Sequence, residues 1–298
     1  AALTSRTLKV ARARAIGDGR FPFVAMDPEL DAAAAAAHAQ GNLAATTDPA
    51  AIAAADVVVV NIGLDVVASD GEPPRAAMEG FLAGLREVGA HLKADALVVI
   101  ETTVPPGTTG RLVAPLLAEG LAARGLPPDA FRLAHAYERV MPGPDYLRSV
   151  THYWRCYAGH TPEAADACLD FLSRFIDTRA FPPRRLSSTL ASETAKIMEN
   201  SYRATTIAMM EEWGRFAEAA GIDVFEIIDA IRVRPTHANM RTPGFGVGGY
   251  LLLSTWSGPA ALLFGLVTVI AAWRTPGHRG LSHWVAGMEL RVERADPS

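Results

Sequence analysis

The chain has 298 residues, of which 50% are apolar and 20% are charged, so it can form a sizeable core in one or two domains. Its net charge of −4 argues against nucleic acid or an anionic membrane as a general partner. Cys156 and Cys168 form neither a disulfide framework nor a metal-ligand pattern, and no secretory leader is visible. We therefore expect a cytoplasmic protein without a metal site.

The first part of the chain alternates predicted helices and strands. Helices are expected over 7–16, from Asp27-Pro28 to Gly41, from about Pro74 to Leu92, from about Thr108 to Ala123, and from Pro162 to Phe175. Short apolar runs predict strands at 56–62, 96–101, 131–136 and 154–158, and the segment 178–181 completes the pattern. This order predicts a doubly wound, largely parallel sheet.

A long helix is expected next, from the Ser/Thr cluster at 187–189 to Gly221. Its apolar residues recur at helical spacing and give one face: Met198, Tyr202, Met209, Trp213, Phe216 and Ala220. Lys196 and Asn200 are four residues apart and share another face. Lysine occurs only at 9, 93 and 196 in a chain rich in arginine, which favours a chemical role for Lys196. Asp223 is expected to start a second helix, and a glycine-rich loop follows at 244–249.

Three polar stretches carry possible chemistry. The segments 101–108 and 138–143 each follow a predicted strand, and Arg232, Arg234, His237 and Arg241 precede the glycine loop. A capped Pro-Gly turn, a surface ion pair and a solvated basic face are the structural alternatives. No Gly-x-Gly-x-x-Gly turn follows a predicted strand, so periodicity alone predicts no nucleotide site.

Five segments taken in order resemble the UDP-glucose/GDP-mannose dehydrogenase family, the nucleotide-sugar 6-dehydrogenases. They are Ala55–Val60, Val99–Thr108, Tyr137–Gly143, Glu193–Asn200 and Pro243–Tyr250. The Glu138-Arg139-Val140 segment, followed by Met-Pro-Gly, is more similar to the UDP-N-acetyl-mannosamine branch than to the UDP-glucose branch.

The resemblance implies that the chain uses NAD to oxidise the C6 alcohol of a UDP-sugar to a carboxylate, for polysaccharide biosynthesis. It implies that Thr103 and Glu101 contact the cofactor, Thr103 also the reacting centre, and that Glu138 orders the hydrolytic water. Lys196 and Asn200 would stabilise developing oxyanions, with Lys196 also as proton acceptor. The implied substrate-binding residues are Arg139, Val140, Arg203, His237, Gly246 and Gly248.

Two departures from the family pattern affect the expected activity. The resemblance begins after the family's glycine-rich phosphate turn, and Leu251 and Thr255 stand where the family carries its nucleophilic Cys and an Asp. We therefore expect an incomplete and catalytically impaired copy of the enzyme.

The expected fold is α/β, an incomplete Rossmann-like sheet followed by a helical domain and an unrelated apolar tail. The expected divisions are a truncated NAD-binding domain at 1–186, a central dimerisation domain at 187–250 and a tail at 251–298. The helix at 188–220 would form a homodimer. The stretch 251–273 is long enough to span a bilayer, but its Ser, Gly and Pro cluster argues against a membrane helix. We expect a tail without an evolved structural role.

Three other functions stay open at this point. One is a non-catalytic dimerising remnant, and another is a two-electron hydroxyacid-type dehydrogenase that uses Lys196 and Asn200 without a cysteine. A membrane-anchored binding module that uses 251–273 is the third.

Overall fold

The computed structural model describes residues 5–24, 26–69, 72–140 and 143–242. The chain divides into two compact units, one up to Glu199 and one from Asn200 onward. Among the described residues, no helix is both long enough and apolar enough to cross a membrane. The glycine loop at 244–249 and the apolar stretch 251–273 lie outside the described residues, and the expected three-part division stays a prediction.

A five-stranded sheet forms the centre of the first unit, in the order β1-β4-β5-β6-β7. Its strands are β1 (Val57–Val60), β4 (Leu97–Ile100), β5 (Arg132–His135), β6 (Cys156–Gly159) and β7 (Arg184–Arg185). The pairs β1–β4, β4–β5 and β6–β7 are parallel, whereas β5–β6 is antiparallel. The predicted α/β fold with a largely parallel sheet is confirmed.

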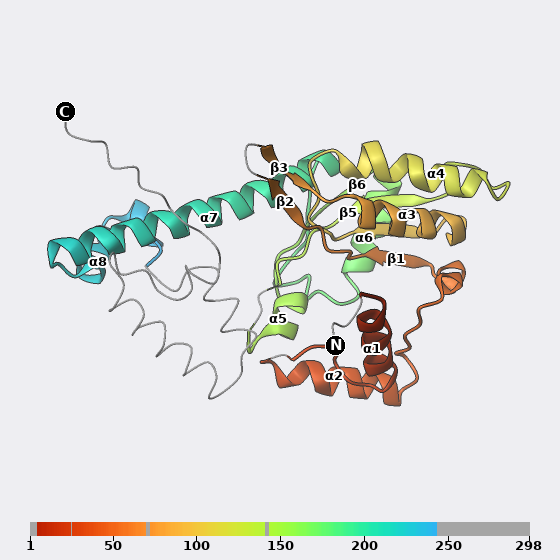
Figure 1. The fold of residues 1–298 in the computed structure, drawn as a ribbon, viewed down its shortest axis with the longest axis horizontal. Coiled ribbons are helices and arrows are strands. Elements are labelled where there is room, and N and C mark those ends of the chain that lie inside the picture. Colours follow the sequence, from red (N-terminus) through yellow and green to blue (C-terminus); the bar gives the residue numbers. More distant parts are fainter. Residues whose placement is uncertain (1–4, 25, 70–71, 141–142, 243–298) are drawn as a thin grey trace. The chain divides into compact units, whose positions relative to one another are not determined.

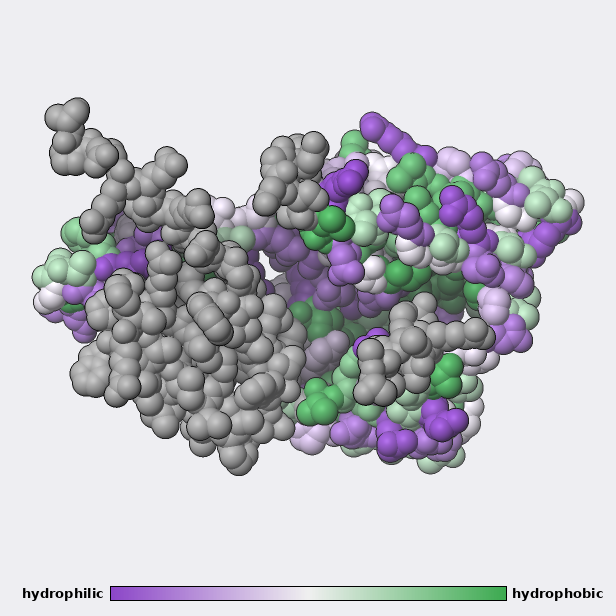
Figure 2. Space-filling model, in the orientation of Figure 1, coloured by the Kyte–Doolittle hydropathy of each residue, from purple (hydrophilic) through white to green (hydrophobic). Residues whose placement is uncertain are grey.

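Helices cover both faces of this sheet (Figure 1). On one face lie α3 (Glu79–His91) and α4 (Ala114–Ala122), the latter preceded by a π-helical turn η2 (Thr109–Val113). On the other face lies α6 (Pro162–Leu172). Strand β4 alternates between the two cores, because Val98 and Ile100 pack with α3 and α4 whereas Leu97 and Val99 pack with α6. Over α3 and α4, hydrophilic and apolar residues mix on the surface (Figure 2).

The predicted helix start at Pro74 is wrong. Residues Glu72–Ala76 form strand β3, which pairs antiparallel with β2 (Val66–Ser69), and α3 begins only at Glu79. A proline can open a helix, but it is also tolerated in the edge strand of a hairpin. Here the hairpin pairing decides between the two.

The last strands of the sheet also differ from the prediction. The strand expected from Trp154 begins at Cys156, and 178–181 holds no strand. The final strand is instead β7, where the amide of Arg184 donates to the carbonyl of Arg155 at 2.7 Å.

The N-terminal elements are α1 (Ser5–Gly17), α2 (Pro28–Ala39) and a 3-10 helix η1 (Pro49–Ala54). Asp27 caps α2 as predicted, because its carboxylate accepts the amide of Glu29 at 2.9 Å. Its other oxygen accepts the amide of Leu147 at 2.8 Å and so ties α2 to α5 (Tyr146–Thr151).

The long helix α7 (Thr189–Ala220) runs from the first unit into the second, and α8 (Val224–Arg232) and a 3-10 turn η3 (Pro235–His237) follow. Gly221 ends α7 with φ of +67°, and Asp223 caps α8, both as predicted. In the second unit Met210, Ala217 and Ile228 are buried. The predicted apolar face is instead mostly exposed: Tyr202, Met209, Trp213 and Phe216 are 74%, 41%, 37% and 69% accessible.

Candidate functional site

A cleft of about 340 Å³ lies where three neighbouring strands of the first unit end. Asn61 follows β1, Glu101 follows β4, and Glu138 follows β5 at its rim. The other lining residues are Val140, Tyr146, Val150 and Arg155. Open parallel sheets bind ligands outside the carboxyl ends of their strands, so this cleft is the candidate active site.

Glu101 forms a buried ion pair with Arg155, with 2.6 Å between Arg155 Nη1 and Glu101 Oε1. The two side chains are 13% and 5% exposed, respectively, and the guanidinium also lies over the ring of Phe175. Such a pair persists only with close geometry, because desolvation of both charges opposes it. The carboxylate of Glu101 is therefore held in place at the edge of the cleft.

The loop after Glu101 is fixed close to the sheet. The hydroxyl of Thr102 accepts the amide of Ile62 at 2.9 Å, which ties this loop to the loop after β1. Thr102 is 4% exposed and Val104 is 1% exposed, whereas Thr103 between them is only partly buried. The loop thus presents Thr103 while its neighbours are packed in the core.

Glu193 of α7 holds the far end of the same loop. This side chain is fully buried, and its carboxylate accepts the amides of Gly107 at 2.5 Å and Thr109 at 2.6 Å. Both amides belong to the start of the helix formed by η2 and α4, where backbone N–H groups lack intrahelical partners. Helix α7 therefore caps α4 from the side.

Lys196 lies one turn further along α7, at the loop after β5. Its Nζ donates to the carbonyl of Glu138 at 2.9 Å and lies 5.4 Å from the ring centre of Tyr137. The carboxylate of Glu138 accepts the amide of Val140 and faces the cleft. Burial, and then the charge of Glu138, raise the pKa of the cleft residue Tyr146. The side chain of Lys196 thus lies against the backbone of Glu138, and the roles that the resemblance implies for both residues stay predictions.

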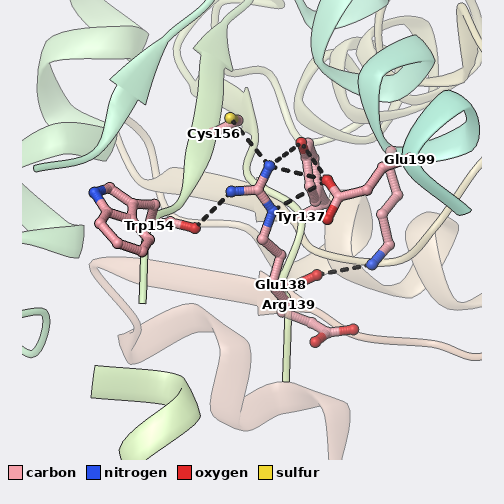
Figure 3. Close-up of polar contacts among 7 residues, drawn as sticks. Tyr137, Glu138, Arg139, Trp154, Cys156 and Glu199 are labelled. Atoms are coloured by element: carbon pink, nitrogen blue, oxygen red, sulfur yellow. Dashed lines mark hydrogen bonds and ion pairs between the residues drawn. The ribbon is translucent and has the colours of Figure 1, made fainter. Parts of the chain in front are cut away.

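Arg139 is the centre of a polar network beside them (Figure 3). Its guanidinium contacts the carboxylate of Glu199 at 2.9 Å, the carbonyl of Trp154 at 3.0 Å and the hydroxyl of Tyr137 at 3.1 Å. Cys156 lies 3.8 Å from the same guanidinium. Burial, and then the hydrogen bond with Cys156, raise the pKa of Tyr137. Arg139 therefore ties β6 and the loop after β5 to α7.

His135 is buried beneath this network. Its Nδ1 lies 2.8 Å from Ser192 Oγ, while Nε2 has no hydrogen-bond partner among the described residues. Desolvation, and to a smaller extent the charge of Lys196, lower its pKa to about 4. His135 is therefore neutral near pH 7.

The other predicted site residues lie in the second unit or outside the described residues. Asn200 and Arg203 belong to α7 and are exposed, and His237 lies in η3. His237 lines a groove of about 1030 Å³ within the second unit, together with Tyr202, Thr206, Met210, Arg232 and Met240. Gly246 and Gly248 lie beyond the described residues.

Two sequence patterns of one family match this chain. The NAD binding domain of the UDP-glucose/GDP-mannose dehydrogenase family matches residues 10–169, and its central domain matches 190–254. The first match alone covers more than half of the chain. The chain belongs to the UDP-glucose/GDP-mannose dehydrogenase family.

Named relatives agree with this assignment. The UDP-N-acetyl-D-mannosamine dehydrogenase of Pyrococcus horikoshii is 30% identical over 251 residues, which cover 82% of this chain and 56% of that protein. The NDP-N-acetyl-D-galactosaminuronic acid dehydrogenase of Ralstonia nicotianae is 31% identical over 248 residues, 80% of this chain and 53% of that protein. The chain thus spans about half the length of these curated relatives.

Solved structures share the fold. A UDP-D-ManNAc dehydrogenase structure from P. horikoshii superposes with a TM-score of 0.67 at 27% identity, and covers 84% of this chain and 55% of that chain. A UDP-glucose dehydrogenase from Pyrobaculum islandicum gives a TM-score of 0.64 at 26% identity, over 75% of this chain and 49% of that chain. The dehydrogenase fold of the first unit is thereby confirmed.

NAD is the cofactor that the matched domain implies, and the described residues fit one part of it. Asn61 and Glu101 place an amide and a carboxylate at the cleft, which suits the hydroxyl groups of a ribose. The described cleft residues give no cradle for a pyrophosphate, because their cation, Arg155, is paired with Glu101. The cleft thus fits the nucleoside part of a dinucleotide.

Sequence reasoning gave no role to Glu193, Arg155 or His135. Glu193 carried a signal, because it lies three residues before Lys196 and so on the same side of the helix. A charged residue inside the predicted strand 154–158 was the signal for Arg155. His135 gave none, because a histidine in a strand is ordinary.

Proposed function

We propose that this chain is an NAD-dependent nucleotide-sugar dehydrogenase that oxidises the C6 alcohol of a UDP-sugar. The observation that carries the proposal is the contact of Lys196 with the Glu138 carbonyl beside the strand-end cleft. The relatives' names add the substrate class, a nucleotide-linked N-acetylated hexose such as UDP-N-acetyl-D-mannosamine.

The proposed roles are those that the family resemblance implies. NAD, when bound, would supply the acceptor for the hydride from C6 of the sugar. Lys196, with Asn200, stabilises the negative charge that develops on the sugar oxygen, and Lys196 takes its proton. Thr103 and Glu101 contact the cofactor, Thr103 also the reacting centre, and Glu138 orders a water. All of these are proposals for this chain.

Substrate binding is proposed for Arg139, Val140, Arg203 and His237, with the glycines Gly246 and Gly248. Arg139 already contacts Glu199, Trp154 and Tyr137. A substrate phosphate would therefore have to replace one of these partners. Val140 offers its carbonyl, since its amide is taken by Glu138.

We further propose that oxidation stops after the first hydride transfer. The family forms a thioester on a cysteine, and Leu251 stands at that position. Alcohol and NAD+ then give aldehyde, NADH and a proton, and no thiol attacks the aldehyde for the second step.

Incubation of the full chain with NAD+ and UDP-N-acetyl-D-mannosamine tests both parts of the proposal. Absorbance at 340 nm counts NADH and mass spectrometry identifies the sugar product. One NADH per sugar, with aldehyde as product, is expected. A carboxylate product with two NADH per sugar would contradict the arrested reaction, and no NADH at all would contradict the dehydrogenase.

A non-catalytic dimerising remnant is the second candidate, favoured by the exposed apolar residues of α7. In either case we propose a homodimer through the helix at 188–220. Calorimetry with NAD distinguishes the remnant from the nucleotide-sugar dehydrogenase, since the remnant would bind no NAD.

A two-electron hydroxyacid-type dehydrogenase would instead turn over a small hydroxy acid. Free Cys156 and Cys168 support a reducing, cytoplasmic location as part of the proposal.

A further inference from the structure

Glu193 is a buried carboxylate without a catalytic position of its own. It is 0% exposed, and both of its oxygens accept backbone amides of the loop after β4. A buried charge is tolerated only when hydrogen bonds replace its hydration, and amide donors at a helix start add the positive end of the helix dipole. These two bonds are therefore strong and specific contacts of the loop.

The loop that Glu193 holds is the one that presents Thr103. Thr102 fixes the beginning of this loop to Ile62, and Glu193 fixes its end at Gly107 and Thr109. Gly107 has φ of +94°, a conformation that costs other residues free energy and that Glu193 stabilises here through the amide. The position of Thr103 depends on both attachments.

We propose that Glu193 is a positioning residue that sets Thr103 relative to Lys196. Both Glu193 and Lys196 belong to α7, three residues apart, and each bonds a different strand-end loop. One rigid helix turn thus fixes the loop after β4 relative to the loop after β5. This inference rests on the proposed function for the role of Thr103, whereas the attachment of the loop does not depend on it.

Hydrogen exchange measures the attachment directly. Pro105 and Pro106 carry no N–H, so a peptide that begins at Pro105 and ends at Thr109 reports only on Gly107, Thr108 and Thr109. Glu193→Gln leaves one acceptor oxygen and turns an NH2 group toward the other amide. We expect exchange in this peptide to become at least about tenfold faster in Glu193→Gln, and faster still in Glu193→Ala. Glu193→Asp keeps two acceptor oxygens and should lie between Gln and the unchanged chain.

The matched control is Thr161→Ala. It removes the cap of α6, where the Thr161 hydroxyl accepts the Ala164 amide at 3.2 Å, and so destabilises the same unit without contact to the loop. Exchange of the 105–109 peptide should not change in this control. Unchanged exchange in Glu193→Ala, or equal acceleration in Thr161→Ala, would overturn the proposal.

Kinetics with NAD+ and the UDP-sugar separates positioning from folding. We expect kcat to fall roughly 10- to 100-fold in Glu193→Gln while KM changes less than about threefold, because misplacement by an ångström affects the reacting geometry most. Partial rescue of kcat in Glu193→Asp is expected as well. If kcat does not change while exchange accelerates, the loop is attached but does not position Thr103, and the proposal fails. If the unchanged chain forms no NADH, the proposed function fails, and the exchange comparison alone decides whether Glu193 fixes the loop.

Discussion

The two parts of helix α7, one in each unit, differ in the side chains that they bury and expose. In the half that belongs to the first unit, Thr189, Ser192 and Glu193 are 7%, 0% and 0% exposed. In the half that belongs to the second unit, Tyr202 and Phe216 are 74% and 69% exposed. One helix thus carries buried polar residues at its start and exposed apolar residues further on.

The two parts of α7 therefore indicate different kinds of functional surface. Each buried polar group is costly unless a partner compensates it, and Glu193 and Ser192 have such partners in the loop after β4 and in His135. Exposed aromatic residues in a row indicate a surface that is covered by another chain. The start of α7 therefore holds the loops beside the candidate site, and its continuation is a candidate interface.

The largest effect on folding is expected from unpairing a buried charge in the unit that contains the start of α7. Arg155→Met removes the cation from Glu101, and loss of one partner of a buried pair costs about 3–5 kcal/mol. Urea unfolding monitored by circular dichroism measures the loss. The control Arg185→Met breaks the exposed pair with Asp166 and should cost less than about 1 kcal/mol. Equal losses in both variants would show that burial of the Glu101–Arg155 pair has no energetic weight.

Lys196→Met tests the proposed chemistry of the same half. Loss of a donor that stabilises developing negative charge lowers kcat by about 100- to 1000-fold. Lys93→Met is the matched control, because Lys93 forms a surface ion pair with Asp56 and should keep full turnover. Similar kcat in both variants would show that Lys196 takes no part in the reaction.

His135 predicts a pH dependence of stability. Its pKa in the folded chain is about 4, below the ordinary value of 6.5, so the unfolded chain alone binds a proton between these pH values. The contribution of His135 is complete above pH 6.5, decreases as the pH falls toward 4 and totals about 3 kcal/mol. Urea unfolding at pH 4 to 7 gives the free energy of unfolding of the unchanged chain and of His135→Gln. The contribution of His135 is the difference between the two proteins in the slope of this free energy against pH. Parallel slopes would contradict a neutral, buried His135.

Phe216→Ser tests the second half of the comparison and has the smallest expected effect on folding. The side chain is 69% exposed, so the free energy of unfolding of the isolated chain should change by no more than about 0.5 kcal/mol. The dimer dissociation constant should rise about tenfold or more, as for an aromatic interface residue. Sedimentation velocity measures it, with Val233→Ser, 82% exposed, as the control outside α7. If the unchanged chain is monomeric, α7 forms no dimer interface and the prediction is wrong.

Local rules predicted the elements whose ends are decided by neighbouring residues. Asp27, Asp223 and Gly221 cap their helices as expected because each acts within a few residues. The start of α3 was missed because β3 pairs with β2 instead of joining the helix. The pattern of neighbouring residues does not show that one segment pairs with another as strands.

The contacts of the site were beyond sequence reasoning for the same reason. Arg155 and Glu101 are 54 residues apart, and Glu193 and Gly107 are 86 apart. Only the folded sheet brings these groups together, so a single sequence shows the charges but not their partners. The resemblance to the family supplied Lys196 and Glu138, and the fold added Glu193.

The rate of NADH formation with and without the Lys196 amine shows whether the cleft beside Lys196 oxidises a nucleotide sugar. The full chain and its Lys196→Met variant are each mixed with NAD+ and UDP-N-acetyl-D-mannosamine, and NADH is followed at 340 nm. We predict one NADH per sugar from the unchanged chain and at least about 100-fold slower formation in the variant. NADH formation at the same rate in both proteins would contradict it.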